Sequence, residues 1–507
     1  MTRSKTATPK TLIEALEIQA RERPEAPAFI ETNERGRDEV TTYGDSLQKV
    51  EEIAARLKSA GVQPGDRVAV RLSKSVASML LFFAVTRAGA VYVPINPDFT
   101  ERESSVLIED SMPVLLIDNR GCNTSLPHEI RNFSFGTNQP NDLLAIEPTS
   151  LPPSPDAQSG ATMLFTSGTT GRPKGAPLTH ENLLSNVLAL ADAWGVSHED
   201  RLLHVLPVFH GHGLFLGIAM MIVRGATVRL LPKYEAEATL RYLPEATVFM
   251  AVPAIYTRLL EHKEFTQKVC RKLRLATSGS APLSPEVFEA LRLRMGIPVV
   301  ERYGLTETCI LTTNPIDGSA RVGSVGRPLS CVELRITNDE NVALESGQAG
   351  RVQVRGPSVI EGYWRRPELK EDWTLDGWFD TGDLGQKDED GYLWLVGRKK
   401  DLIITGGFNV YPREIEIELE ALEGVAEAVV FGVPHPDFGE GVMAAVRPES
   451  DKMVNLKSLE SALGEKLARY KRPKRIIILE EFPRNQMGKV LKTDLRKSYA
   501  NEFAKTP

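Results

Sequence analysis

Apolar and polar residues alternate with two different periodicities along residues 11–150. Residues 12–21 and 76–88 carry apolar side chains at helical spacing, whereas residues 67–72 alternate as a half-buried strand does. Segments of the two kinds follow one another along the chain, which is typical of layered α/β folds. This pattern predicts an α/β architecture.

The alternation continues beyond a proline-rich connection at residues 150–160. Strands are expected at residues 161–165, 247–252 and 299–302, and a glycine-punctuated stretch at residues 323–396 predicts a small β-rich subdomain. We place a domain boundary near Lys400, which divides the chain into residues 1–399 and 400–507. In the second part a helix, a strand, a helix and a strand are expected at residues 413–422, 426–433, 456–470 and 475–479.

Composition and charge narrow the class of protein. A chain of 507 residues exceeds what one hydrophobic core usually organises, and 42% hydrophobic with 25% charged residues is the balance of an ordinary globular protein. A formal net charge of −6 provides no basic field for nucleic acid, which we therefore exclude as a partner. Four widely spaced cysteines without a Cys-x-x-Cys pair predict neither a disulfide framework nor a zinc site: Cys122, Cys270, Cys309 and Cys331.

The pattern predicts no membrane span and no secretory signal. The most apolar run, residues 214–223, is about half the length that a span requires and ends at Arg224, so we interpret it as a buried helix. Residues 1–10 are basic and hydroxyl-rich without an apolar core, which leaves a short organellar transit segment open. We expect a cytoplasmic protein with reduced cysteines.

The strongest chemical signal is the segment at residues 166–175, Thr-Ser-Gly-Thr-Thr-Gly-Arg-Pro-Lys-Gly, directly after a predicted strand. Glycines let backbone N–H groups approach a phosphate, hydroxyls donate hydrogen bonds and a lysine neutralises charge. Pro173 stands where a Walker A loop has its second glycine, so this is a different phosphate loop, and a flexible linker would lack the ordered Arg-Pro-Lys. The candidate phosphate ligands are Thr166, Ser167, Gly168, Thr169, Thr170, Gly171 and Lys174.

Further segments carry groups that suit a nucleotide. Residues 301–308 supply an aromatic ring, hydroxyls and a carboxylate for base stacking, phosphate contact and a hydrated Mg²⁺, although Thr306 also suits a helix cap. Asp383 can accept two hydrogen bonds from ribose hydroxyls, although aspartates in glycine turns more often form Asx-turns. Residues 397–401 and 405–409 bracket a short strand, and Lys489 follows a glycine in what is more simply a solvated turn.

Each signal is modest alone, but their order and spacing form one pattern. The segments at residues 166–175, 303–307, 381–383 and 397–400, followed by Lys489, resemble the acyl-adenylate-forming superfamily of AMP-dependent synthetases and ligases. The resemblance extends from about residue 12 to residue 497. It implies an α/β fold with a large N-terminal domain of two doubly wound sheets plus a β-barrel, and a small mobile α+β C-terminal domain. It also implies that ATP, Mg²⁺ and coenzyme A (CoA) take part, and that a carboxylic acid is activated as acyl-AMP before a thiol takes the acyl group.

The resemblance assigns a role to each candidate residue. Lys489 is expected to bridge the carboxylate and the α-phosphate during adenylation, and Lys400 to be the hinge. In an exposed turn, Lys489 is also an expected target of a lysine acetyltransferase and deacetylase. The CoA tunnel is expected to involve Gly406, Gly407 and Phe408. Besides the phosphate loop, the ATP residues are Gly279, Ser280, Ala281, Pro282, Glu301, Arg302, Tyr303, Gly304, Asp383 and Arg398, with Thr306 and Glu307 at the α-phosphate and Glu307 and Thr170 at Mg²⁺.

Two segments near the expected acid pocket, residues 206–215 and 252–258, are similar to those of malonyl-CoA synthetases. The similarity implies that Arg258 holds the second carboxylate of malonate or methylmalonate, since a bidentate guanidinium suits a buried carboxylate. The alternative for Arg258 is the solvated face of a helix. The other acid-pocket residues implied are Ser278, His210 and His212, with His210 also among the catalytic residues.

Other functions share the ATP motifs. An aryl- or medium-chain acyl-CoA ligase differs in the acid, an adenylation enzyme that loads a carrier protein differs in the thiol, and a luciferase-like oxygenase oxidises the adenylate. A non-catalytic adenylate-binding protein is disfavoured, because the chain retains Lys174, Glu307, Asp383 and Lys489. The exact acid, the acceptor thiol and the oligomeric state stay open.

Overall fold

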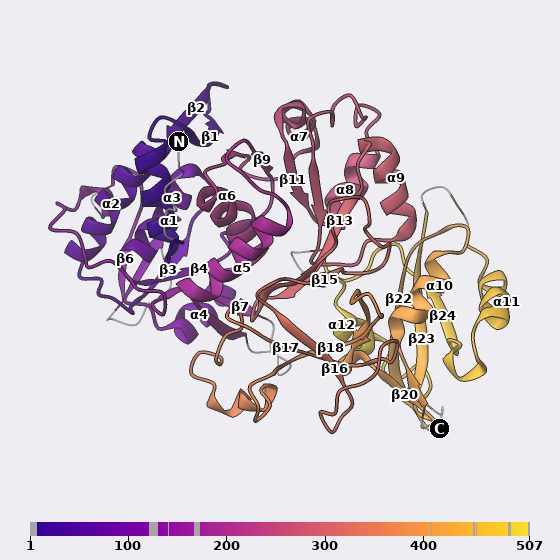
Figure 1. Cartoon of the computed structure of the whole chain (residues 1–507). Coiled ribbons are helices and arrows are strands. Elements are labelled where there is room, and N and C mark those ends of the chain that lie inside the picture. The colour runs from indigo at the N-terminus through magenta and orange to yellow at the C-terminus, as the bar shows by residue number, and fades with distance from the viewer. Residues whose placement is uncertain are drawn as a thin grey trace.

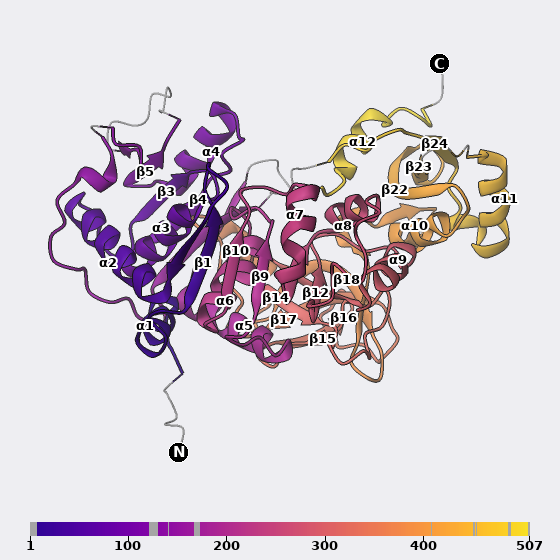
Figure 2. The same cartoon turned by 90° about the horizontal axis from the view of Figure 1, so that it is seen from above.

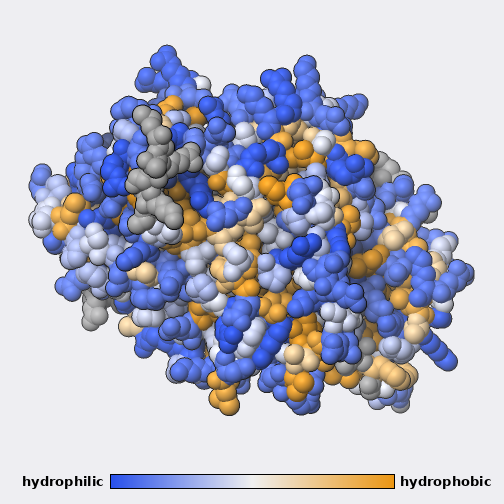
Figure 3. Space-filling model, in the orientation of Figure 1, coloured by the Kyte–Doolittle hydropathy of each residue, from blue (hydrophilic) through white to orange (hydrophobic). Residues whose placement is uncertain are grey.

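The computed structural model describes residues 8–120, 130–139, 141–166, 173–406, 408–449, 452, 454–484 and 488–504. Two large sheets come first along the chain, a small antiparallel sheet follows, and a further sheet forms the C-terminal part (Figure 1). Figure 2 shows the C-terminal elements at the opposite end of the molecule from the first sheet and its helices. Figure 3 shows that hydrophilic residues cover most of one face, with smaller hydrophobic areas toward its centre.

The first sheet has six strands in the order β6, β5, β3, β4, β7, β8, and only the β7–β8 pair is antiparallel. Helix α3 begins at a capping box of Ser75 and Ser78, and it is buried on all sides because it contacts α1, α2 and strands of both large sheets. The strands are β3 (Arg67–Arg71), β4 (Val91–Pro94), β5 (Leu115–Asp118), β6 (Arg131–Phe133), β7 (Gly160–Thr166) and β8 (Lys174–Thr179). The helices are α1 (Leu12–Glu22), α2 (Tyr43–Ser59), α3 (Val76–Arg87), α4 (Glu101–Ser111) and the 3₁₀ turn η1 (Leu143–Ala145).

The second sheet has nine strands in the order β15, β14, β13, β12, β11, β9, β10, β1, β2, with a parallel centre and antiparallel edges. The apolar run at residues 214–223 is buried, as predicted, but its first part is a π-helix rather than an α-helix. The strands are β1 (Pro27–Thr32), β2 (Asp38–Thr42), β9 (Arg201–His204), β10 (Thr227–Leu230), β11 (Val248–Ala251), β12 (Leu275–Ser278), β13 (Val299–Leu305), β14 (Cys309–Thr313) and β15 (Arg327–Pro328). The helices are α5 (His180–Ala193), η2 (His212–Ala219), α6 (Met220–Val223), α7 (Ala236–Tyr242), η3 (Leu243–Glu245), α8 (Pro253–Leu260) and α9 (Pro285–Met295).

A four-stranded antiparallel sheet occupies the glycine-punctuated stretch, where a small β-rich subdomain was predicted. Among the described residues its pairing runs in a line from β16 to β19. One hydrophobic cluster joins this sheet to the two large ones, so the three sheets form a single large domain. The elements are β16 (Glu333–Thr337), β17 (Gly350–Arg355), η4 (Pro367–Asp372), β18 (Phe379–Lys387), β19 (Leu393–Arg398) and η5 (Lys399–Asp401).

The C-terminal part is a five-stranded sheet with helices, the α+β arrangement expected for the small domain. Its hydrophobic clusters are separate from that of the large domain and begin at Ile403, which is compatible with the proposed boundary near Lys400. Strand β23 was not predicted, because Gly439 and Gly441 interrupt its pattern. The elements are β20 (Ile403–Thr405), β21 (Phe408–Val410), α10 (Pro412–Glu420), β22 (Val425–His435), β23 (Gly439–Pro448), α11 (Leu456–Lys466), η6 (Arg469–Lys471), β24 (Arg475–Ile478) and α12 (Lys492–Ser498).

The described residues bear on two sequence predictions, those on membrane spans and on cysteines. None of the described helices is long and apolar enough to cross a membrane. Cys270, Cys309 and Cys331 are free thiols, and Cys122 lies outside the described residues.

Candidate active site

The two ends of the predicted phosphate loop lie side by side. β7 ends at Thr166 and β8 begins at Lys174, and these residues are paired across the antiparallel ladder. The ends of the loop therefore lie at the carboxyl end of β7 in a doubly wound sheet, and such folds bind ligands at the carboxyl ends of their strands. Five predicted loop residues lie outside the described part of the chain: Ser167, Gly168, Thr169, Thr170 and Gly171.

A carboxylate lies at the ends of this loop. The Thr166 hydroxyl donates to Glu307 Oε1 at 3.4 Å, and the Tyr363 hydroxyl donates to the same oxygen at 2.9 Å. The Lys174 ammonium lies 4.7 Å from the centre of the Tyr363 ring and 3.8 Å from the Asp372 carboxylate. Mg²⁺ is commonly bound by one or two protein carboxylates together with substrate phosphates, so Glu307 fits the expected metal role. In the described ranges no group of three or more His, Cys, Asp or Glu side chains could hold a metal ion.

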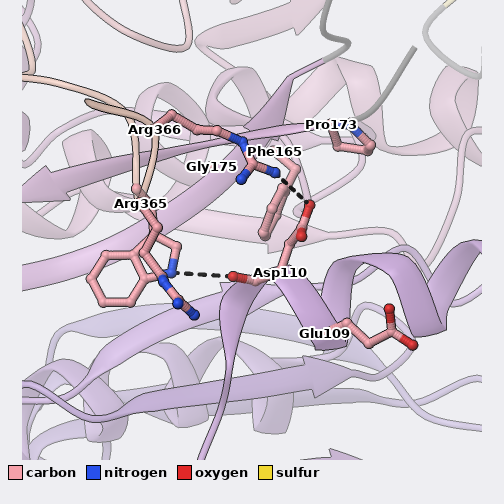
Figure 4. Close-up of a pocket in the computed structure, with 8 residues that line it drawn as sticks. Glu109, Asp110, Phe165, Pro173, Gly175, Arg365 and Arg366 are labelled. Carbon is pink, nitrogen blue, oxygen red and sulfur yellow. Dashed lines mark hydrogen bonds and ion pairs between the residues drawn. The ribbon is translucent and has the colours of Figure 1, made fainter. Parts of the chain in front are cut away.

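The residues that follow Tyr363 contact helix α4 and strand β8 of the first sheet, and Figure 4 shows Arg365 and Arg366 beside Asp110. The backbone N–H of Trp364 donates to Gly175 O at 2.8 Å, its indole N–H donates to Asp110 O at 3.1 Å, and Arg366 pairs with the Asp110 carboxylate at 3.4 Å. A cavity of about 270 Å³ lies between these groups and Pro173. Sequence reasoning missed Tyr363 because it lies in an irregular segment, and its glycine–aromatic neighbourhood was the only available signal.

The turn between β13 and β14 contains Thr306, which was predicted at the α-phosphate. A Cβ on Gly304 would lie 2.0 Å from Cys309 O, so glycine permits this tight turn. The Leu305 N–H is bound by the Thr308 hydroxyl at 3.3 Å. Thr306 therefore caps no helix, which removes the alternative that the sequence left open, and it stands between Leu305 and Glu307 at the phosphate end of the site.

The two residues predicted at the ribose, Asp383 and Arg398, contact each other, and Asp383 also contacts Tyr303, which was predicted at the adenine. The Tyr303 hydroxyl donates to Asp383 Oδ2 at 2.6 Å, and Arg398 Nε lies 2.7 Å from Asp383 Oδ1. Burial and the Asp383 charge raise the pKa of Tyr303 well above its usual value, so the phenol stays a donor. The Asx-turn in this segment is made by Asp380, which accepts the Gly382 N–H at 3.0 Å. Asp383 therefore makes no Asx-turn itself; its two carboxylate oxygens contact Tyr303 and Arg398, and its contact with a ribose stays a prediction.

A buried cation lies among the residues expected to bind the acid. Arg302 on β13 is 7% exposed, and two of its nitrogens, Nε and one Nη, have no hydrogen-bond partner in the described part of the chain. Burial lowers the pKa of the Arg302 guanidinium to about 10. A Cβ on Gly279 would lie 2.4 Å from Arg302 Cζ, so a glycine there leaves room for the guanidinium. Sequence analysis placed Arg302 among the ATP residues and did not consider it for the acid.

Buried polar groups lie beside Arg302 and on the neighbouring strand β12. Both ring nitrogens of His212, which lies close enough to Arg302 to feel its charge, and the hydroxyls of Thr277 and Ser278 on β12 have no partner among the described residues. Burial and the Arg302 charge hold the pKa of His212 well below its usual range, and burial lowers the pKa of His210 to about 4, so both rings are neutral at pH 7. Because buried polar groups normally have partners, this cluster indicates a pocket for a polar ligand.

Arg258 has a different setting. It lies on α8 with an exposed side chain, one helical turn beyond Ala254 and on the same face. A Cβ on Gly488 would lie 3.8 Å from Ala254 Cβ, which brings the C-terminal loop to this face. The exposure fits the solvated-helix alternative, and a contact between Arg258 and the acid stays a prediction.

The loop that carries Lys489 reaches the ribose residues. Desolvation, and next the charge of Arg398, lower the pKa of Lys489 to about 8, while Asp383 raises it. Lys489 therefore lies close enough to Arg398 and Asp383 to feel their charges, and its catalytic role stays a prediction. The predicted adenine segment, residues 279–282, follows β12, which pairs with β13, and Ser280 in it has a positive φ of 71°.

The expected hinge and CoA residues lie in the C-terminal part. Lys400 is exposed, and its carbonyl accepts a hydrogen bond from Arg496 at 3.1 Å. Phe408 is 54% exposed and stacks on Tyr470 with ring centres 4.6 Å apart, and Gly406 precedes it with a φ of 57°. Gly407 lies outside the described residues. The hinge and tunnel roles stay predictions.

Comparisons with known proteins agree with this geometry. The model of the AMP-binding enzyme family matches residues 16–364, and that of the AMP-binding enzyme C-terminal domain matches residues 414–489. The structure is similar to that of ATP-bound MatB from Rhodopseudomonas palustris, with a TM-score of 0.90, 37% sequence identity and coverage of 97% of this chain and 99% of that one.

Two plant relatives act on different acids. The oxalate–CoA ligase of Arabidopsis thaliana is 34% identical over 483 residues, which cover 90% of this chain and 92% of that protein. The malonate–CoA ligase of the same plant is 38% identical over 374 residues, which cover 68% of this chain and 61% of that protein.

Proposed function

Because this chain belongs to the AMP-binding enzyme family and is an ATP-dependent acid–thiol ligase that forms acyl-CoA, we propose that its acid is a short dicarboxylate, with malonate first and methylmalonate second. The names of the relatives do not decide the acid, since one acts on oxalate and another on malonate. The observation that carries the proposal is the buried Arg302 without an acidic partner in the described part of the chain.

An unpaired buried guanidinium is strongly unfavourable, and a ligand carboxylate relieves it through paired charge-assisted hydrogen bonds. One carboxylate of the acid must face the α-phosphate to react, so the group that reaches Arg302 is a second carboxylate. His212, which lies close enough to Arg302 to feel its charge and has no partner in the described part of the chain, supplies a further polar contact at that end. A fatty or aryl acid would fill the pocket and leave Arg302 unpaired.

The chemistry needs no nucleophile from the protein. A carboxylate oxygen of the acid attacks the α-phosphorus of ATP, the bond to pyrophosphate breaks, and a mixed anhydride with AMP forms. Lys489 stabilises the charge that develops between carboxylate and phosphate. Glu307 would hold Mg²⁺, which would supply positive charge against the phosphates. The CoA thiol then attacks the carbonyl carbon and AMP leaves.

The second step requires Lys489 to withdraw. Rotation about Lys400 would remove it and bring Gly406 and Phe408 toward the acyl group, and the exposure of Phe408 supports this assignment. Acetylation of Lys489 would remove its charge and stop the first step, so we also propose it as a modification site.

A substrate panel tests the proposal. The enzyme is assayed for pyrophosphate release with malonate, methylmalonate, oxalate, butyrate, benzoate and octanoate, with and without CoA. We expect malonate to have the highest kcat/KM, and butyrate, which lacks the second carboxylate, to be poorer by at least about tenfold. Preference for butyrate, benzoate or octanoate over every dicarboxylate would refute the proposed acid while leaving the ligase activity intact.

A further inference from the structure

A buried lysine lies between the two large sheets, outside the residues discussed so far. Lys74 is 8% exposed and stands between the end of β3 and Ser75, the N-cap of α3. Burial lowers the pKa of its ammonium to about 7, although the Glu31 charge opposes this shift. A buried amine of this kind is tolerated only where specific hydrogen bonds compensate it.

Lys74 makes its hydrogen bonds to the second sheet. Its Nζ donates to Leu206 O at 2.8 Å and contacts Nδ1 of His204, the last residue of β9, at 3.4 Å. On the other side of the ring, His204 Nε2 lies 2.9 Å from Gly213 O. An ammonium only donates and a carbonyl only accepts, so the ring is neutral and carries its proton on Nε2. Burial and the Lys74 charge lower the pKa of His204 to about 3, which maintains this form.

These hydrogen bonds hold the two ends of one loop, residues 206–213. Residues 206–213 contain His210 and His212, and the carbonyls of Leu206 and Gly213 at its two ends accept from Lys74 and His204 respectively. A Cβ on Gly213 would lie 1.9 Å from the carbonyl oxygen of Pro207, so the loop leaves no room for a side chain at position 213. Its last two residues, His212 and Gly213, are also the first two of the π-helix η2, a geometry frequent at functional sites.

We propose that Lys74 is a positioning residue for the acid pocket: together with His204 it clamps both ends of the loop at residues 206–213 and so fixes where His210 and His212 meet the acid. The inference rests on the proposed acid pocket, but not on which acid fills it. Neither clamp residue touches the acid. Displacing a binding group by about 1 Å can lower the rate about a hundredfold, so loss of the clamp is measurable as a lower kcat/KM for the acid.

Lys74→Met tests the clamp, because it removes the donor to both Leu206 and His204 while preserving an unbranched apolar chain. We expect kcat/KM for the acid to fall about 10- to 100-fold. The loss should appear in the KM for the acid, with the KM for ATP within about twofold of the parent enzyme. The acid used is the one turned over fastest in the substrate panel, so an error in the proposed acid leaves this test intact.

A double-mutant cycle separates the clamp from general damage. His204→Leu should cause a similar loss, and the double variant should be no worse than the poorer single variant, because both changes break the same clamp. His204→Gln, whose amide both donates and accepts, should restore part of the activity. If the two losses multiply, Lys74 does not act through His204 and the proposal is overturned.

Tyr43→Phe is the matched control. The Tyr43 hydroxyl donates to Ala226 O at 2.7 Å, a buried hydrogen bond from the first layer to the second sheet that does not involve the loop. This variant should melt at a lower temperature with an unchanged KM for the acid. If Lys74→Met gives the same result, Lys74 is merely structural. Should Lys74→Met not fold, Lys74→Gln replaces it in the same comparison, with the same two outcomes.

Discussion

Replacing Arg302 with methionine removes the buried charge on which the proposed substrate depends. Burial lowers the pKa of the guanidinium from 12.5 to about 10, and at about 1.4 kcal/mol for each pKa unit this corresponds to a penalty of about 3 kcal/mol on the charged form. The penalty applies fully below pH 10 and fades as the pH rises from about 10 to 12.5. A bound carboxylate offsets it, which is why the acid should supply one.

The two readouts of Arg302→Met should move in opposite directions. Malonate loses its ion-pair partner, which should cost about 2 to 5 kcal/mol of transition-state binding. The value of kcat/KM should therefore fall roughly thirtyfold to several thousandfold. In the absence of acid, the free energy of unfolding at pH 7 should rise, with about 3 kcal/mol as the upper limit, because an unpaired buried charge is removed. Pyrophosphate release with malonate and with butyrate, and thermal unfolding of the apoprotein, measure these effects.

Arg258→Met is the matched comparison, since it removes the exposed arginine of the same pocket region. It should change turnover of malonate by less than about threefold, and it should leave stability nearly unchanged. Butyrate turnover should hold or improve in Arg302→Met, which separates charge loss from a damaged pocket. A malonate loss confined to Arg258→Met, with Arg302→Met close to the parent enzyme, would refute the role of Arg302 and restore the original assignment to Arg258.

Lys489→Met should abolish acyl-AMP formation and spare thioester formation from a supplied acyl-adenylate, measured separately; equal loss in both steps contradicts the assignment. Because the pKa of Lys489 is lowered to about 8, kcat/KM for adenylation, which reports the free enzyme, should decline above about pH 8, and a profile flat to pH 9 would count against it. Tyr363→Phe removes the hydrogen bond to Glu307 and should raise the Mg²⁺ concentration needed for half-maximal rate about two- to tenfold; an unchanged Mg²⁺ titration would show that the bond is incidental. Burial raises the pKa of Glu301 from 4.5 to about 7, so its ionisation destabilises the folded state as the pH rises through this window. Glu301→Gln should therefore gain stability relative to the parent at pH 8 but not at pH 4.5, and melting temperatures that differ equally at both values would refute this.

Local and contiguous signals in the sequence predicted much of the fold. The helix of residues 12–21, the strand of residues 67–72 and the helix of residues 76–88 correspond to α1, β3 and α3, because periodicity and caps act over a few neighbouring residues. The phosphate-loop ends, Glu307 and Asp383 also belong to short motifs, and the structure joins Thr166 to Glu307 and Tyr303 to Asp383. Strand β23 and the π-geometry of η2 were missed, because glycines mask a strand and an apolar run does not specify the type of helix.

No local sequence pattern specifies which distant side chains contact each other or how deeply each one is buried. Tyr363 lies 56 positions from Glu307, and Lys74 lies 130 positions from His204, so only the packing of the sheets brings these pairs together. The same holds for the two arginines of the acid region: both are ordinary basic residues in the sequence, yet β13 buries Arg302 beneath Gly279 while α8 leaves Arg258 in solvent. Desolvation is a property of the folded environment, so the residue that most needs a carboxylate partner becomes visible only in the tertiary structure.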